Sequence, residues 1–111
     1  MSYNVKSIAV FEKQAKRLIK KYASLKNELS ILGKELAEKP QQGTALGNNC
    51  YKIRLSIASK RRGKSGGARV ITNLIIDKNT VYLISIYDKS EKDNISDNEL
   101  DQLIKLIPEE E

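Results

Sequence analysis

The stretch Tyr51-Lys52-Ile53-Arg54-Leu55-Ser56-Ile57 decides the fold, because apolar and polar side chains alternate along it without a break. This period of two predicts a β-strand with an apolar face and a polar face, and the polar face carries Lys52 and Arg54 in succession. The apolar face must be covered by other parts of the chain. The cationic face is left for solvent or for an anion.

Two further strands follow, at residues 69–77 and 80–87, with a tight turn at residues 77–79. Together with the first they predict an antiparallel meander. The intervening loop, residues 59–67, has three glycines and four basic residues. Its sequence is similar to the end of a phosphate-binding loop, but Ala58 stands where that motif needs glycine, and a strand follows instead of a helix. We therefore reject a nucleotide hydrolase.

Upstream of the meander the apolar spacing becomes helical. Residues 5–10 predict a first strand, and a helix follows whose apolar face is Phe11, Ala15, Leu18, Ile19 and Tyr22. Ser24 is the expected N-cap of a second helix, whose apolar stripe is Leu25, Leu29, Leu32 and Leu36. Pro40 and the polar residues after it end this helical hairpin.

A last helix is predicted by its start and stop signals. Ser96 and Glu99 have the spacing of a capping box, and Pro108 stops the helix. The expected fold is α+β, of order β-α-α-β-β-β-α, with the helical hairpin and the C-terminal helix packed on one face of an antiparallel sheet. Residues 1–108 form the single expected domain, and residues 109–111 an acidic tail.

Composition excludes several kinds of chemistry. The 111 residues are 40% hydrophobic and 31% charged, which is typical of one globular domain. Histidine is absent and Cys50 is the single cysteine, so histidine-based nucleophilic systems, imidazole metal sites and an internal disulfide are excluded. We expect no metal and no cofactor. The chain has no long apolar run and no evident secretory signal, which predicts a cytoplasmic protein without membrane contact.

Charge is distributed unevenly along the chain. Residues 1–69 carry 16 Lys and Arg against 4 Glu, whereas residues 70–111 carry 4 Lys against 10 Asp and Glu. A basic front with an acidic end is typical of a polyanion-binding protein, most often a nucleic-acid binder. A lysine-rich surface that only confers solubility is the alternative, and composition does not decide between them.

Basic residues from several elements are expected to converge at one end of the meander. Lys52 and Arg54 share a strand face, Arg69 opens the next strand, and Tyr87 and Lys89 follow the third. The glycine-rich loop adds Lys60, Arg61, Arg62 and Lys64. An ordinary solvent-exposed sheet face is the simpler interpretation. Convergence from three strands favours an anion site.

Three segments resemble the RelE/ParE superfamily, and within it the HigB/RelE-type toxins of bacterial type II toxin–antitoxin systems. They are Cys50-Tyr-Lys-Ile-Arg-Leu55, Gly63-Lys-Ser-Gly-Gly-Ala-Arg-Val70 and Val81-Tyr-Leu-Ile-Ser-Ile-Tyr-Asp-Lys-Ser-Glu91. The resemblance implies a ribosome-dependent mRNA endoribonuclease (an mRNA interferase) that inhibits translation. It also implies silencing by a cognate antitoxin, expected to be of the helix-turn-helix type. Some relatives instead inhibit DNA gyrase, so that function and a non-catalytic or degenerate nucleic-acid-binding toxin stay open.

The resemblance also assigns the basic positions. Lys52 and Arg54 match the paired basic residues of the central strand, Arg69 the arginine that begins the next strand, and Lys89 the basic position after the last one. Some relatives carry a tyrosine near the position of Ile95, for which Tyr87 is the candidate substitute.

Cleavage by the RNA 2′-hydroxyl needs no metal, and each basic residue has an expected role in it. Lys52 is the expected base, Arg54 and Arg69 the phosphate contacts, and Lys89 or Tyr87 the proton donor. On the first helix, Lys20 and Lys21 are expected to contact ribosomal RNA.

Overall fold

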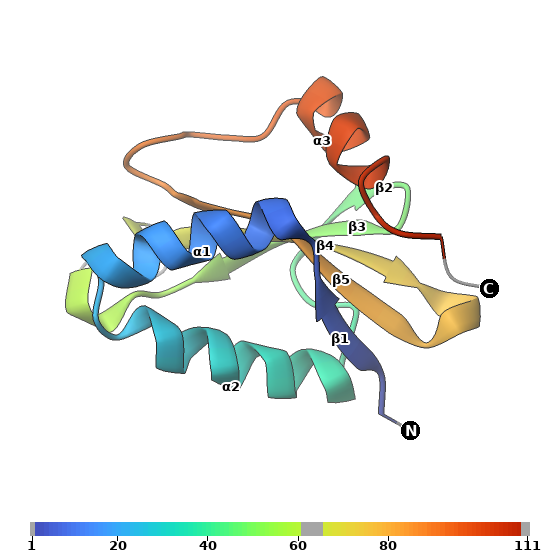
Figure 1. The fold of residues 1–111 in the computed structure, drawn as a ribbon, viewed down its shortest axis with the longest axis horizontal. Helices are drawn as coiled ribbons and strands as arrows, with labels where there is room; N and C mark the ends of the chain where they lie inside the picture. The colour runs from blue at the N-terminus through green and yellow to red at the C-terminus, as the bar shows by residue number, and fades with distance from the viewer. Residues whose placement is uncertain (1, 61–65, 110–111) are drawn as a thin grey trace.

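The structure, a computed structural model, describes residues 2–60 and 66–109. Its elements are β1 (Asn4–Ser7), α1 (Ala9–Lys21), α2 (Leu25–Glu38), β2 (Thr44–Gly47), β3 (Cys50–Leu55), the 3-10 helix η1 (Ala58–Lys60), β4 (Ala68–Ile75), the 3-10 helix η3 (Ile76–Lys78), β5 (Thr80–Asp88) and α3 (Asp97–Ile104) (Figure 1). The predicted α+β class is confirmed, with one strand more than expected. Among the described residues, no helix has the length and apolar character of a membrane span.

The five strands form one mixed sheet in the order β1-β5-β4-β3-β2. Strands β2 to β5 pair antiparallel, whereas β1 runs parallel to β5, from Asn4 opposite Thr80 to Ser7 opposite Leu83. The expectation of a wholly antiparallel sheet is therefore wrong at this edge. No hairpin turn links β1 to β5, so nothing local in the sequence dictates their relative direction.

The first strand is shorter than predicted, because it ends at Ser7 and helix α1 begins at Ala9. The Ser7 hydroxyl donates a 2.8 Å hydrogen bond to Glu12 in the first turn of α1. Ile8 and Phe11 are buried in the core. Burial of these side chains through the helix overrides the strand preference of the β-branched residues at positions 8 and 10.

Strand β2 was not predicted, and it reaches the sheet through a two-residue turn. Gly47 pairs with Cys50, and Asn48 and Asn49 between them have φ of 53° and 60°. Asparagine tolerates this left-handed conformation, which two-residue hairpins require, so the Asn-Asn pair was the available signal. On the way into β2, Gly43 has φ of +93°, and a Cβ there would lie 2.3 Å from the carbonyl oxygen of Lys52. The close approach requires glycine.

Helices α1 and α2 form the predicted hairpin and bury a continuous apolar stripe against one face of the sheet. Its buried members are Phe11, Ala15, Leu18, Leu25, Leu32 and Leu36. Ser24 occupies the N-cap of α2 as predicted. Its hydroxyl accepts from the N–H of Ser59 at 3.0 Å and donates to Glu28, so it joins the hairpin to η1 instead of capping a helical N–H.

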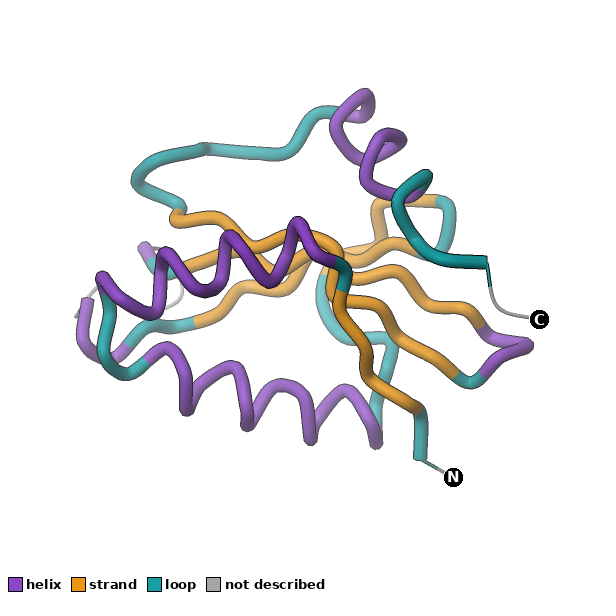
Figure 2. The backbone as a smooth tube through the Cα atoms, in the orientation of Figure 1, coloured by secondary structure: helices purple, strands orange, loops and turns teal. Residues whose placement is uncertain are grey.

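Helix α3 begins with the predicted capping box, in which Ser96 and Glu99 each accept a hydrogen bond from the other's backbone N–H. It lies across the sheet from the hairpin (Figure 1), where Ile104 and Ile107 line a hollow with Asn73. The expectation that all helices share one face is therefore wrong. Residues 89–96 run back along the sheet before α3 begins (Figure 2), so α3 covers only part of its face.

Candidate active site

Strands β3 and β4 bring basic side chains to one face through their register, and β5 adds a tyrosine beside them. Arg54 lies opposite Arg69, and Arg69 lies opposite Tyr87. Directly opposed residues of antiparallel strands project on the same side, with Cβ atoms about 5 Å apart. Lys52 precedes Arg54 by two positions and shares its face. We refer to Lys52, Arg54 and Arg69 as the cationic cluster.

The three cations differ in exposure. Arg54 is exposed, and Lys52 is half-buried with its Nζ donating to the side-chain oxygen of Asn94 at 3.3 Å. Arg69 is only 5% exposed, and its Nη1 donates to the carbonyl oxygen of Ala68 at 3.1 Å. Arg54 is therefore the most accessible member of the cluster, Lys52 is partly accessible, and the side chain of Arg69 is buried beside them.

Tyr87 lies beside this cluster with its hydroxyl covered. That hydroxyl is buried and has no hydrogen-bond partner among the residues the structure describes. Burial raises the pKa of Tyr87, while the charge of Arg69 acts in the opposite direction, so the phenol keeps its proton near neutral pH. The Nζ of Lys92 lies 5.7 Å from the centroid of the ring.

The segment after β5 adds a carboxylate next to the cluster. The ammonium of Lys89 donates to the carboxylate of Asp93 and, at 2.7 Å, to its backbone carbonyl. The hydrogen bond from Lys89 to the carboxylate lowers the pKa of Asp93, and the charges of Lys52 and Arg69 lower it further. Lys89 is thus engaged at the edge of the cluster, and Asp93 opposes part of the positive field there.

Six further residues were predicted to bind RNA: Lys60, Arg61, Arg62 and Lys64 at the anion site, and Lys20 and Lys21 on the first helix. Lys60 lies away from the cationic cluster, where its ammonium pairs with Asp88 and its side chain is only 8% exposed. Lys20 and Lys21 lie on α1, and Lys21 pairs with Glu91 at 3.4 Å. The remaining three, Arg61, Arg62 and Lys64, lie outside the described residues.

The pair formed by Lys60 belongs to a buried polar group that sequence reasoning missed, which we call the Asp88 cluster. The fully buried carboxylate of Asp88 accepts from Lys60, from the hydroxyl of Tyr22 at 2.5 Å and from the hydroxyl and N–H of Ser90. Burial raises the pKa of Asp88, but these donors outweigh it and hold the pKa well below its usual range. Asp88 thereby joins α1, η1 and the end of β5.

Fold and site together define a class: a small α+β domain that presents cations from two adjacent strands, beside a tyrosine of a third, on a partly open sheet face. The sequence model that describes the RelE toxin of the RelE/RelB toxin–antitoxin system matches residues 8–109. The chain therefore belongs to the RelE toxin family, and the resemblance predicted from the sequence is confirmed.

Solved structures show the same fold. The isolated Escherichia coli RelE toxin has a TM-score of 0.62 and 20% identity, and the match covers 96% of this chain and 100% of that one. The intact E. coli RelBE toxin–antitoxin complex gives 0.61 and 22%, covering 78% and 96%. The RelBE2 toxin–antitoxin complex of Mycobacterium tuberculosis gives 0.57 and 12%, covering 79% and 92%.

Proposed function

We propose that this chain is the toxin of a toxin–antitoxin pair and that it cleaves mRNA bound to the ribosome, using the cationic cluster as its active site. Membership of the RelE family supports the toxin role. The observation that carries the proposed cleavage is the register that sets Arg54, Arg69 and Tyr87 side by side on the face shared by Lys52. Cations on neighbouring strands repel one another, so a phosphate between them is the natural counter-charge.

The cluster supports an intramolecular transesterification of the RNA, in which phosphorus exchanges its bond to the 5′-oxygen for a bond to the neighbouring 2′-oxygen. Lys52 in its neutral form takes the proton of the 2′-hydroxyl, whose oxygen attacks the adjacent phosphorus. The bond from phosphorus to the 5′-oxygen breaks, which leaves a cyclic phosphate on one product. Arg54 contacts the non-bridging oxygens, and Arg69 stabilises the added negative charge from beneath. The leaving oxygen takes its proton from Tyr87 or Lys89.

Positioning of the RNA by the ribosome compensates for a site without histidine. Alignment of reacting groups supplies up to about 7–11 kcal/mol of a barrier, which is more than one general base contributes. The covered hydroxyl of Tyr87 and the Lys89–Asp93 pair indicate that the unbound site is not fully arranged for catalysis. The cognate antitoxin is the protein partner in this proposal.

The test is cleavage of ribosome-bound mRNA by purified variants. Lys52→Ala and Arg54→Ala should each slow cleavage about 100-fold or more, because they remove the base and a phosphate contact. Lys34→Ala removes an exposed cation from α2 and should cleave at the wild-type rate. Tyr87→Phe and Lys89→Met compare the two candidate proton donors.

Two results would contradict the proposal. The first is wild-type cleavage by both Lys52→Ala and Arg54→Ala. The second is intact ribosome-bound mRNA together with arrest of DNA gyrase by the unmodified protein, which would establish the gyrase-inhibiting alternative.

A further inference from the structure

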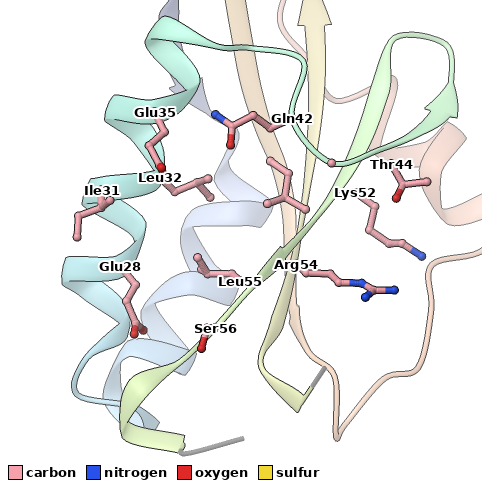
Figure 3. A pocket seen from close by; sticks show the side chains of 12 residues that line it. Glu28, Ile31, Leu32, Glu35, Gln42, Thr44, Lys52, Arg54, Leu55 and Ser56 are labelled. Carbon is pink, nitrogen blue, oxygen red and sulfur yellow. The ribbon is translucent and has the colours of Figure 1, made fainter. Parts of the chain in front are cut away.

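The segment between β5 and α3, residues 89–96, contacts the cationic cluster through a side chain that the proposed reaction does not use. The Nζ of Lys52 donates a hydrogen bond to the side-chain oxygen of Asn94 at 3.3 Å. Figure 3 shows Lys52 and Arg54 on the same side of β3, turned away from the groove that Leu32 of α2 lines. Asn94 therefore meets Lys52 on the open face of the sheet, where the RNA is proposed to bind.

The backbone on both sides of Asn94 is held by contacts of its own. Before it, the ammonium of Lys89 donates to the backbone carbonyl of Asp93 at 2.7 Å and also to the Asp93 carboxylate. After it, Ile95 packs against the hydrophobic core, and Ser96 begins the capping box of α3. The exposed side chain of Asn94 lies between these two anchors. The segment thus presents one amide at a fixed position on the cationic face.

The chemistry of an amide matches the needs of a general base. The oxygen of Asn94 is an uncharged acceptor, so it takes one N–H of the Lys52 amine and leaves the lone pair of the nitrogen for the proton of the 2′-hydroxyl. A carboxylate in the same position would favour the charged ammonium, which has no lone pair and cannot act as a base. The neighbouring carboxylate of Asp93 is instead paired with Lys89.

We propose that Asn94 is a positioning residue, which holds the Lys52 amine in place for proton abstraction. The inference rests on the proposed function, in which Lys52 is the base. Without this contact, the long side chain of Lys52 can occupy other rotamers on an open sheet face. Misplacement of a catalytic group by about 1 Å costs up to about 100-fold in rate. Asn94 thereby acts on the chemical step and not on the affinity for the RNA.

The charges around Lys52 determine what a carboxylate at position 94 would change. Among the described residues, the charged groups that face Lys52 come from β3, β4 and the segment after β5: Arg54, Arg69, Lys89 and Asp93. Thr44 and Ile71, which lie opposite Lys52 on the two neighbouring strands, carry no charge. The carboxylate that is present is already engaged by Lys89, so an aspartate at position 94 would act on Lys52 directly.

The experiment measures kcat and KM for cleavage of mRNA on programmed ribosomes at several pH values. Asn94→Ala should lower kcat about tenfold and leave KM within about twofold of the wild-type value. Asn94→Asp keeps the shape of the side chain but favours the ammonium form of Lys52. Its rate should therefore rise toward the wild-type rate only at a pH about one unit higher.

Asn98 provides the matched controls, because it is also exposed but lines a different hollow, with Gln14 of α1. Asn98→Ala and Asn98→Asp should cleave with the wild-type kcat and pH dependence. The contact itself is measured without any cleavage, by NMR of the side-chain amide of Asn94. Lys52→Met should shift these signals, whereas Lys34→Met, at an exposed lysine of α2, should not.

Three results would overturn the inference: a wild-type kcat for Asn94→Ala, a loss in Asn94→Asp that is equal at every pH, or side-chain amide signals of Asn94 that do not respond to Lys52→Met. Circular dichroism confirms that the variants are folded. The proposed function fails separately. Wild-type cleavage by Lys52→Ala refutes Lys52 as the base, whereas slow cleavage by Lys52→Ala with a wild-type kcat for Asn94→Ala refutes only the positioning role.

Discussion

Tyr87 and Asp88 are neighbours in β5, yet they belong to two regions that use charge in opposite ways. On the face toward the helical hairpin, the Asp88 cluster matches each buried charge with a partner, as in the pair with Lys60. On the other face, the cationic cluster places Arg54 opposite Arg69, and the carboxylate of Asp93 lies close enough for the charges of Lys52 and Arg69 to lower its pKa. The buried charges of the first region are matched in pairs, whereas the second region brings cations of two neighbouring strands side by side.

The largest expected difference between the regions concerns stability. Asp88→Asn leaves the ammonium of Lys60 buried without its counter-charge and should lower the free energy of unfolding by about 3–5 kcal/mol. Arg54→Ala, at an exposed position, should change it by less than about 0.5 kcal/mol. Urea denaturation followed by circular dichroism measures both.

A matched double variant tests whether the uncompensated charge is the cause. Asp88→Asn combined with Lys60→Met removes both members of the pair and should recover a large part of the lost stability. A double variant as unstable as Asp88→Asn alone would show that shape, and not charge, is what the Asp88 cluster provides.

The second prediction concerns acid. The folded-state pKa of Asp88 is lowered, so its contribution to stability is present above the unfolded-state value of about 3.9 and is lost as pH falls below it. The wild-type protein should therefore lose more stability between pH 6 and pH 3 than the double Asp88→Asn, Lys60→Met variant. Urea midpoints at the two pH values measure the loss of stability in each protein. Equal losses would show that Asp88 does not contribute to the acid sensitivity of the wild-type protein.

The smallest expected effect is on the open face, where Asp93 competes with an anion for the cationic cluster. Asp93→Asn removes this charge and should tighten binding of a short RNA oligonucleotide by about twofold to fivefold at low salt. Asp97→Asn, which removes an acidic side chain from the first turn of α3, serves as the control. Fluorescence anisotropy measures the affinity, and an unchanged or weaker affinity for Asp93→Asn contradicts the competition.

Most of the local structure could be predicted, because it depends on nearby residues. The alternation in residues 51–57 predicts β3, the apolar stripes predict α1 and α2, and Ser96 with Glu99 predicts the start of α3. Strand β2 was missed although its Asn48-Asn49 turn is a local signal, and the other errors arose where distant parts of the chain meet. The parallel pairing of β1, the placement of α3 across the sheet and the early start of α1 all depend on contacts far apart in sequence.

The site shows the same division. That Lys52 and Arg54 share a face follows from a period of two, which the sequence displays directly. The register between strands decides that Arg69 lies opposite Arg54. The position of η1 beside β5 decides that Lys60 is buried against Asp88. Periodicity determines which residues can act together on one element. Only the packed fold decides which charges are buried against a partner and which lie on the open face of the sheet, because pairing and desolvation depend on neighbours in space.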